Sequence, residues 1–471
     1  AADGKVKAEL GDDAEKKGVY SFSFTVYNLT NEPLTYVPDA KVLTPAILHK
    51  DSGNYMSLSE TALDPIVTYG VEGAAGTTYL YDFNGDGEVD RLDAQYLSDF
   101  VAGIKTLSKE AEAAADFNCD GIVDSLDVYI MLTLLEGEKE DGISLNKSSS
   151  KILLAPNGSA KVTVTVELTE NDRKYFADNT PNGGYVEGYI GLSGVNELSI
   201  PFLAFYGNYT DASMFDRASY LDYLNGLSDK ASYVKEDSKV NLLTQKIPGV
   251  SSTPIFGMNL YADDESFSPE QNYVLSTTSG TGLYQAVPTL IRTTARMETT
   301  ISNAETGEVY YTTFSAPSAA YYNSNSGAWA GTSSAVRLGS GSAGWKGVDA
   351  EGNPLPDGTV VNVTCTAAPE LYTFKDEAGN LTIDKEKLGK GASWTTTLTM
   401  DNTAPEIQSV YYADDLWGNN DYLTVTVKDN RYVAAVILFN EKGNTALART
   451  AVPQTEMGET TEVRLNLGED V

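Results

Sequence analysis

Residues 82–93 read DFNGDGEVDRLD, and residues 116–127 repeat this pattern as DFNCDGIVDSLD. Each stretch places Asp, Asn and Asp at positions 1, 3 and 5, Gly at position 6, and Asp at positions 9 and 12. Alternate residues of a tight loop point side-chain oxygens inward, Gly takes the sharp turn, and the carbonyl of position 7 adds an oxygen. Two copies in register therefore predict a pair of sites for a hard divalent cation, Ca²⁺.

The composition of the chain limits the classes of partner that it can have. Its 471 residues are enough for about three domains. The formal net charge of −33 repels the phosphate backbone of nucleic acids. The sequence contains no run of about 18 apolar residues, so we expect no membrane span. The two cysteines cannot form a metal cluster or a disulfide framework, and Cys365, which alternates with apolar residues, is expected to be a small core side chain.

Outside the repeated loops the dominant pattern is that of β-strands. Residues 19–27 alternate large apolar and small polar side chains, which is typical of a strand with one buried face, and residues 34–37 are the expected hairpin partner. Because few strands precede the loops, we expect the sandwich to be completed by strands after them. These later strand signals lie in residues 152–154, 160–168, 184–190 and 198–205.

The segment that contains the loops has a helical period instead. After the first loop, the apolar residues that share one helical face are Leu92, Tyr96, Leu97, Phe100 and Val101. After the second loop they are Leu126, Ile130, Leu134 and Leu135. On this pattern Leu92, Leu126 and Phe100 are expected to belong to the core of a small helical module that is inserted in the first β domain.

The expected fold is mainly β, with two to three fibronectin- or Ig-like sandwiches and one inserted all-α calcium-binding module. The expected domains are the first part of a sandwich at residues 1–78, the helical module at 79–142, the second part of that sandwich at 143–206, a second sandwich at 207–403 and a third, truncated one at 404–471. The first residues lack a signal segment and the last resemble a strand that is cut short, so we expect a piece of a longer protein.

The helical segment resembles a dockerin, a module with two F-hand loops that are each followed by a helix and that lack the entering helix of an EF-hand. The resemblance implies two Ca²⁺ ions and a cohesin module as partner. Its partner-recognition positions 10 and 11 fall on Arg91, Leu92, Ser125 and Leu126. The calcium ligands that it implies are Asp82, Asn84, Asp86, Glu88 (backbone), Asp90, Asp93, Asp116, Asn118, Asp120, Ile122 (backbone), Asp124 and Asp127.

The β portion resembles the fibronectin-like region behind the catalytic domain of cell-envelope subtilisin-like proteases of the lactocepin type. The stretches that carry this resemblance are residues 183–190, 198–207, 345–358 and 401–407. The resemblance implies a non-catalytic region that braces the protease and helps to dock its protein or peptide substrate. It also implies an extracellular or cell-surface location, which suits a pair of calcium loops.

No catalytic triad can be assembled from this sequence. The only histidine, His49, lacks a glycine-rich surrounding motif, and residues 331–335 have only a superficial likeness to the segment around a subtilase serine, Ser333. We therefore expect this chain not to be an enzyme, although its parent protein is expected to be a subtilisin-like serine endopeptidase.

The resulting hypothesis is a calcium-dependent accessory region of a secreted or surface protease. Its inserted dockerin either binds a cohesin or acts as an internal brace. The alternative is a cellulosome-type component that is attached through its dockerin and holds polysaccharide. For that alternative, the Tyr-rich runs at residues 321–322 and 411–412 are candidate stacking surfaces, although aromatic side chains of strands mostly serve in packing.

Overall fold

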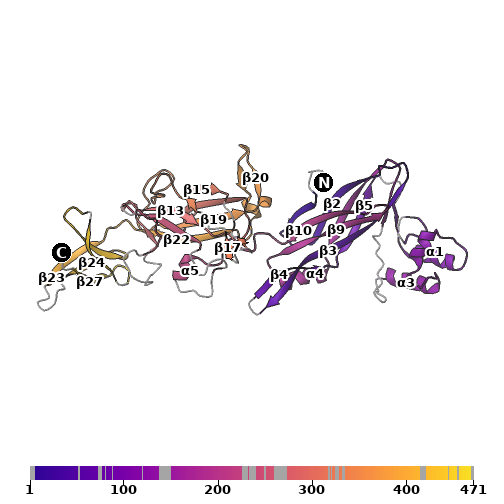
Figure 1. The fold of residues 1–471 in the computed structure, drawn as a ribbon, viewed down its shortest axis with the longest axis horizontal. Helices are drawn as coiled ribbons and strands as arrows, with labels where there is room; N and C mark the ends of the chain where they lie inside the picture. Colours follow the sequence, from indigo (N-terminus) through magenta and orange to yellow (C-terminus); the bar gives the residue numbers. More distant parts are fainter. Residues whose placement is uncertain are drawn as a thin grey trace. The chain divides into compact units, whose positions relative to one another are not determined.

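The computed structural model shows a chain built mostly of β-strands, which confirms the expected mainly β fold (Figure 1). The chain divides into two compact units, Ala1–Tyr209 and Thr210–Val471. None of the helices in the described residues combines the length and apolar character that a bilayer span requires. The described residues are 6–50, 53–72, 77–79, 81–86, 89–118, 120–136, 150–224, 232, 240–248, 251–258, 273–316, 319, 321–323, 328–330, 335–413, 421–443, 445–452 and 456–467.

The first unit contains two sheets and a group of helices. One sheet has the strand order β1-β10-β9-β3-β7-β6, with β4 paired to β3, and the other has the order β2-β8-β5. The strands are β1 (Ala8–Asp13), β2 (Val19–Tyr27), β3 (Leu34–Lys50), β4 (Gly53–Ala62), β5 (Ile66–Glu72), β6 (Thr77–Tyr79), β7 (Ser150–Leu154), β8 (Ser159–Glu167), β9 (Gly184–Gly194) and β10 (Leu198–Tyr206). The helices are α1 (Arg91–Val101), α2 (Lys109–Ala115), α3 (Ser125–Leu135) and α4 (Glu170–Asn179).

Strands from before and after the helical segment pair with one another in both sheets. β8 lies between β2 and β5 and is antiparallel to both, and β9 pairs with β3 from Tyr36↔Gly194 to Leu43↔Glu187. β6 and β7, which flank the helical segment, are themselves antiparallel partners. The chain therefore leaves the sheet along β6 and returns beside it along β7.

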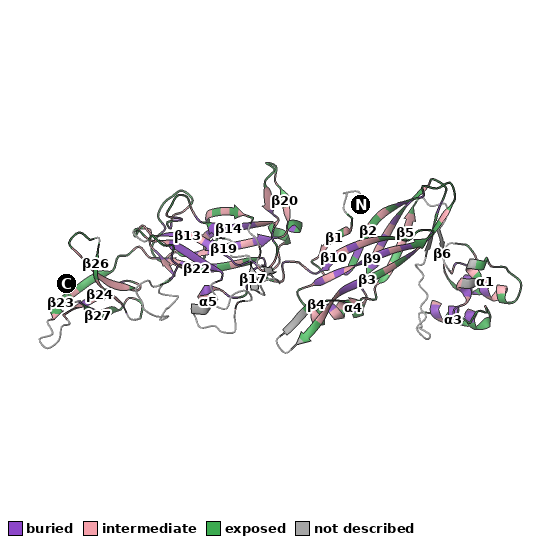
Figure 2. Ribbon diagram, in the orientation of Figure 1, coloured by how far each residue is buried: buried purple, intermediate pink, exposed green. Residues whose placement is uncertain are grey.

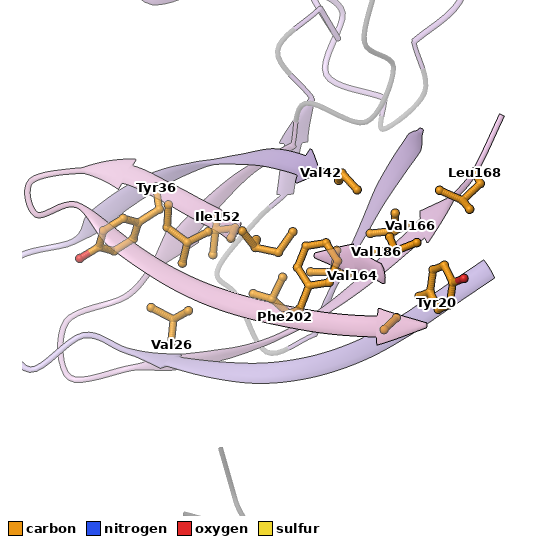
Figure 3. Packing of buried hydrophobic residues seen from close by; sticks show 14 of the residues in the cluster. Tyr20, Val26, Tyr36, Val42, Ile152, Val164, Val166, Leu168, Val186 and Phe202 are labelled. Carbon is orange, nitrogen blue, oxygen red and sulfur yellow. The ribbon is translucent and has the colours of Figure 1, made fainter. Parts of the chain in front are cut away.

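One hydrophobic core joins the two sheets of the first unit. Alternating residues of β8 are completely buried, and they pack with side chains from β9 and β10 of the other sheet (Figures 2 and 3). The two-residue period of a strand explains this pattern, because successive side chains point to opposite faces. The most deeply buried members include Ile152, Val162, Val164, Val166, Val186, Ile190 and Phe202.

The expected hairpin between residues 19–27 and 34–37 is wrong. β2 pairs with β8, whereas β3 starts at Leu34 in the other sheet and pairs there with β4, β7 and β9. The connection crosses from one layer to the other and is held by Asn28, which is 1% exposed. Its Nδ2 donates to the carbonyls of Glu32 at 2.7 Å and Ala155 at 2.9 Å. These bonds satisfy the buried side-chain amide of Asn28. The connection is therefore an arch between two sheets, not the turn of a hairpin.

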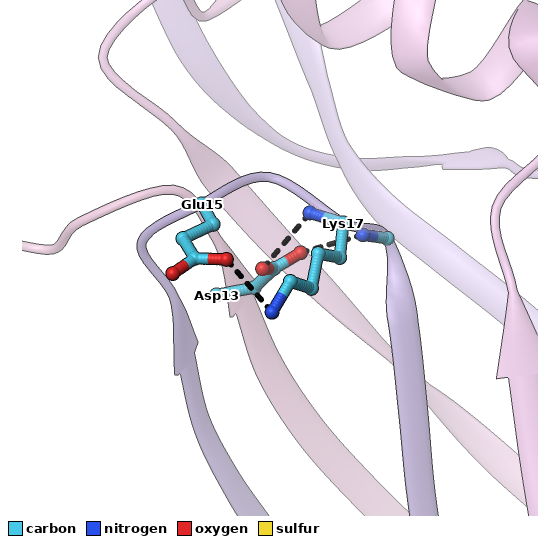
Figure 4. A network of polar contacts seen from close by, with 4 residues as sticks. Asp13, Glu15 and Lys17 are labelled. Atoms are coloured by element: carbon cyan, nitrogen blue, oxygen red, sulfur yellow. Dashed lines mark hydrogen bonds and ion pairs between the residues drawn. The ribbon is translucent and has the colours of Figure 1, made fainter.

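The turn between β1 and β2 is organised by one carboxylate (Figure 4). Asp13 accepts hydrogen bonds from the backbone N–H groups of Lys17 and Gly18, at 2.9 and 2.6 Å. The Lys17 ammonium lies 2.7 Å from the Glu15 carboxylate, and this contact lowers the pKa of Glu15 and raises the pKa of Lys17. Both side chains are exposed, so the ion pair contributes little to stability.

Two helices of the first unit were absent from the expectations. α4 begins after Thr169, whose hydroxyl caps the helix, and the Asp172 side chain accepts the N–H of Thr169 in return. This Thr-x-x-Asp sequence is a local helix-start signal. α2 directly precedes the second loop, so this loop does have a short entering helix, in contrast to the module that the sequence resembles.

The second unit consists of several smaller sheets. Their strand orders are β12-β22-β19-β14-β15, β11-β13-β18, β23-β24-β27, β16-β17, β20-β21 and β25-β26. β14 and β15 form an antiparallel hairpin, and the unit also contains the short helix α5 (Tyr220–Leu224). Two 3₁₀ helices cover Glu370–Tyr372 and Lys385–Lys387.

The strand bounds of the second unit complete the fold. They are β11 (Leu242–Lys246), β12 (Val274–Leu275), β13 (Gly282–Val287), β14 (Arg296–Asn303), β15 (Val309–Ser315), β16 (Tyr321–Asn323), β17 (Ala328–Ala330), β18 (Val336–Arg337), β19 (Val360–Ala368), β20 (Thr373–Lys375), β21 (Leu381–Ile383), β22 (Ser393–Met400), β23 (Glu406–Ala413), β24 (Tyr422–Lys428), β25 (Ala435–Phe439), β26 (Ala446–Ala451) and β27 (Thr460–Asn466).

We predict that Gly188→Ala weakens the first unit by about 3 kcal/mol, because an added Cβ lies 1.9 Å from the Lys41 carbonyl oxygen of the neighbouring strand. The control is Gly70→Ala in β5, where the nearest atoms to the added Cβ are 3.9 Å away. Scanning calorimetry of the full chain should show a lower melting temperature for Gly188→Ala alone. Equal melting temperatures for the two variants would contradict the β3–β9 pairing.

The thiol of Cys365 should be unreactive in the native chain. The expectation that it is a core side chain is confirmed, because it is completely buried in β19 and burial raises its pKa to about 12. Since the thiolate is the reactive form, alkylation at pH 8 followed by peptide mapping should label Cys365 only after unfolding. Labelling at equal rates in native and unfolded protein would refute this placement.

Candidate metal centre

The two repeated loops lead into helices whose first turns are built in the same way. α1 follows Asp90 and α3 follows Asp124, and the carboxylate of each of these residues accepts the backbone N–H two residues later at 2.7 Å. In return, Asp93 accepts the N–H of Asp90 at 2.9 Å, and Asp127 accepts the N–H of Asp124 at 2.8 Å. Loop positions 9 and 12 thus form a capping box in both copies, and negative charge there suits the positive end of a helix dipole.

The carboxylates at position 12 are completely buried, since Asp93 and Asp127 are both 0% exposed. Each also receives an N–H from the start of its own loop, from Asn84 at 3.1 Å for Asp93 and from Phe117 at 2.8 Å for Asp127. Burial raises the pKa of Asp93, backbone N–H donors lower it, and the nearby negative charge of Asp82 raises it further. Position 12 therefore holds the end of each loop against its beginning.

The side-chain oxygens at positions 1 and 3 bond with backbone N–H groups of the same loop. Asp82 Oδ1 accepts from Gly85 at 2.6 Å and from Asp86 at 3.1 Å, and Asn84 Oδ1 accepts from Asp86 at 2.8 Å. In the second loop, Asp116 accepts from Asp120 at 3.1 Å and from Gly121 at 2.8 Å, and Asn118 accepts from Asp120 at 3.0 Å. These bonds curl both loops in the same manner.

The sharp turn at position 6 is present in the second loop, where Gly121 has a φ of +82°. Such a φ strains any residue with a Cβ, which explains why glycine stands there. Gly87 and Glu88 of the first loop and Cys119 of the second lie outside the described residues, so the expected backbone ligand at Glu88 has no structural description. Its counterpart Ile122 is described and is 64% exposed.

The loop residues provide the oxygen ligands that a hard cation prefers, but the described side chains are not already arranged as a coordination sphere. Within the described part of the chain, no group of three or more His, Cys, Asp and Glu side chains is arranged to hold a metal ion. The donors at positions 1, 3, 5, 9 and 12 are nevertheless all oxygens of the kind that Ca²⁺ binds. The repulsion between Asp82 and Asp93, which raises the pKa of Asp93, is the kind that a cation relieves.

Among the described residues, the helical module has a core of its own, separate from the core of the two sheets. Its buried members are Phe83, Ala94, Leu97, Ala115, Phe117, Ile130, Met131 and Leu134. Phe100 packs against this core as expected. Leu92 and Leu126 do not, because they are 60% and 49% exposed. The expectation that they are core residues is therefore wrong. Positions 10 and 11 lie on the side of the first helical turn that points away from the other helix of the module.

The four residues assigned to partner recognition are all exposed. Arg91 forms an ion pair with Glu136 beyond the end of α3, and Leu92, Ser125 and Leu126 face solvent. Sequence reasoning missed Tyr129, which is 56% exposed on α3, one helical turn after Leu126. The three-residue spacing from Leu126 was the available signal, since side chains three apart are neighbours on a helix.

The structure describes only some of the other residues that were singled out in the sequence. His49 is exposed in β3, and Ser333 and the side chains of Tyr321 and Tyr322 lie outside the described part. Tyr411 and Tyr412 are 66% and 60% exposed in β23. As neighbours in a strand, these two rings point to opposite faces of the sheet and do not form one stacking platform.

Comparison with known families gives two partial matches. A model of the dockerin type I domain matches residues 80–136, and a model of an Fn3-like domain matches residues 116–203. The matches overlap in residues 116–136, which hold the second loop and α3, so the strands of the Fn3-like match are those from β7 into β10. No curated protein matches the chain. A dockerin module and an Fn3-like domain are non-catalytic elements.

We predict that Asp90→Ala lowers the free energy of unfolding of the module by about 1 kcal/mol in calcium-free buffer, because it removes the cap of α1. Hydrogen exchange of peptides from α1 in the full chain reports this change. Gln95→Ala, an exposed substitution within the same helix that raises helix propensity, is the control. Unchanged exchange in Asp90→Ala would show that the carboxylate does not cap the helix.

Proposed function

We propose that the chain is a non-catalytic accessory region whose helical module binds Ca²⁺ and docks onto a cohesin module of another protein. The observation that carries this proposal is the structural identity of the two loop-helix units. In both, the position-12 carboxylate is buried against the loop while positions 10 and 11 are exposed. The proposed domains keep the expected limits, with the module at residues 79–142 inserted in a sandwich formed by residues 1–78 and 143–206.

Each loop is proposed to hold one Ca²⁺ ion through the residues assigned to it in the sequence. A bound Ca²⁺ ion would supply positive charge that neutralises the carboxylates of each loop. The chain's own part is to present the oxygens at fixed loop positions. The hydrogen bonds that Asp93 and Asp127 accept from backbone N–H groups place each position-12 carboxylate at the start of its helix, beside its loop.

The proposed docking face contains Arg91, Leu92, Ser125 and Leu126. Leu92 and Leu126 are large apolar side chains at equivalent positions of the two units, and both remain exposed although the module has a well-packed core. Apolar side chains that are exposed to solvent on a helix are suited to burial by a partner protein. Tyr129 extends this face along α3.

The rival role for the module is an internal brace. β6 and β7 pair with each other at the two ends of the helical segment, with Thr78 opposite Lys151. The module is therefore attached at both ends to the same sheet, unlike a tether on a single flexible linker. A brace requires no partner protein, so a binding experiment separates the two roles.

The wider context that we propose is a subtilisin-like serine protease outside the cell or on its surface. The sequence resemblance of residues 183–190 and 198–207 supports it, and these stretches build most of β9 and β10 in the sheet. In that context the sandwiches brace the protease and help to dock a protein or peptide substrate. The polysaccharide alternative has weaker support, because Tyr411 and Tyr412 lie on opposite faces of β23.

We predict that the full chain binds at least one member of a panel of recombinant cohesin modules in millimolar Ca²⁺, and that a chelator abolishes this binding. Biolayer interferometry with the chain immobilised measures both. Leu126→Asp should weaken the binding by at least about 10-fold, because it places a charge in an apolar contact. Ile104→Asp is the matched control, since Ile104 is 71% exposed beyond the end of α1.

Two outcomes would contradict the docking role. Calcium-independent binding would show that the loops do not control the contact. Absence of binding across the whole panel, with Ca²⁺ still taken up by the chain, would favour the internal brace.

A further inference from the structure

The ring of Tyr81 lies between the two loops of the helical module. Tyr81 directly precedes the first loop, yet its ring stacks on Phe117 of the second, with centroids 5.2 Å apart and planes at 27°. It also meets Phe83 of the first loop edge-on, at 6.5 Å and 72°. Phe83 and Phe117 occupy the same loop position, position 2, and both are buried. One side chain therefore contacts the equivalent ring of each loop.

The two position-2 residues are also tied to the position-12 carboxylates. The N–H of Phe117 donates to Asp127 Oδ1 at 2.8 Å. In the first loop the N–H of Asn84, the residue after Phe83, donates to Asp93 Oδ1 at 3.1 Å. A continuous series of contacts thus runs from Asp127 through Phe117, Tyr81 and Phe83 to Asn84 and Asp93.

We propose that Tyr81 couples the two loops, so that Ca²⁺ in one loop raises the affinity of the other. This inference rests on the proposed binding of Ca²⁺ by both loops. An ion that fixes a position-12 carboxylate also fixes the backbone and ring of position 2 in that loop. The ring restricts Tyr81, and Tyr81 in turn restricts the ring of the other loop before its ion binds. The conformational entropy of the shared contacts is then lost when the first ion binds and is not lost again with the second. The second ion therefore binds more tightly, which is positive coupling.

The units also meet through the core that α1 and α3 share and through the ion pair of Arg91 with Glu136. Both side chains are more than half exposed, and exposed ion pairs contribute little because water and salt screen them. The aromatic contacts lie in the module's own core, where Tyr81 packs against the cluster that contains Phe83 and Phe117. The geometry therefore assigns the coupling to the aromatic ring rather than to the ion pair.

The test measures the Ca²⁺ affinity of one loop with the other loop intact or disabled. Asp86→Ala disables the first loop and Asp120→Ala the second, each by removing an exposed position-5 carboxylate. Calorimetric titration of the metal-free full chain with CaCl₂ gives the affinities. In the wild-type background, disabling the first loop should lower the affinity of the second by at least about 5-fold. In a Tyr81→Leu background the same loss should be less than about 2-fold.

Three further variants separate coupling from general damage. Tyr81→Phe keeps the ring and should retain the wild-type coupling. Tyr129→Leu removes an exposed tyrosine of the same module and should also retain it. Phe117→Leu removes the ring on which Tyr81 stacks, so it should abolish the coupling even if Tyr81→Leu fails to fold.

The outcomes that overturn the inference are distinct from failure of the proposed function. Coupling of 5-fold or more that persists in Tyr81→Leu or Phe117→Leu would refute the role of Tyr81, and so would two independent sites in the wild type. A wild-type chain that takes up no Ca²⁺ would refute the proposed calcium sites themselves, and the coupling with them.

Discussion

The helical module depends on two carboxylates that are completely removed from water. Asp93 and Asp127 each join three parts of the structure: the first turn of a helix, the N-cap residue of that helix and the start of the preceding loop. A buried carboxylate is stable only when hydrogen bonds or a cation compensate its charge. Both units satisfy this requirement with the same kind of hydrogen bonds, so each loop with its following helix is a copy of one structural unit. The exposure of positions 10 and 11 follows from the geometry of that unit.

The sandwich of the first unit supplies the frame from which the module emerges. Its core is built by strands that lie more than a hundred residues apart in the chain, as in the pairing of Val26 with Ala160. The helical segment starts and ends at adjacent strands, β6 and β7, so it interrupts the chain without interrupting either sheet. The aromatic contacts of Tyr81 lie beyond β6, at the entry to the first loop.

The sequence was most informative where structure is set by local chemistry. The oxygens at fixed loop positions predicted both loops and the helices that follow them, and the alternation in residues 19–27 predicted β2. Strand pairing depends on distant residues, so the predicted partner of β2 was wrong: Leu34 and Leu154 pair in one sheet while Tyr20 and Val166 pair in the other. Helical period alone placed Leu92 and Leu126 in the core. The helical period did not show that the capping box orients the first helical turn so that these two side chains point to solvent.

We propose that the two equivalent loops close around metal ions within an otherwise independent β frame. Hydrogen exchange of the full chain, compared in Ca²⁺ and in chelator, tests it most directly. We expect residues 82–101 and 116–135 to gain protection in Ca²⁺, while the exchange of β8, β9 and β10 is unchanged. Equal exchange of both loops with and without Ca²⁺ would contradict it.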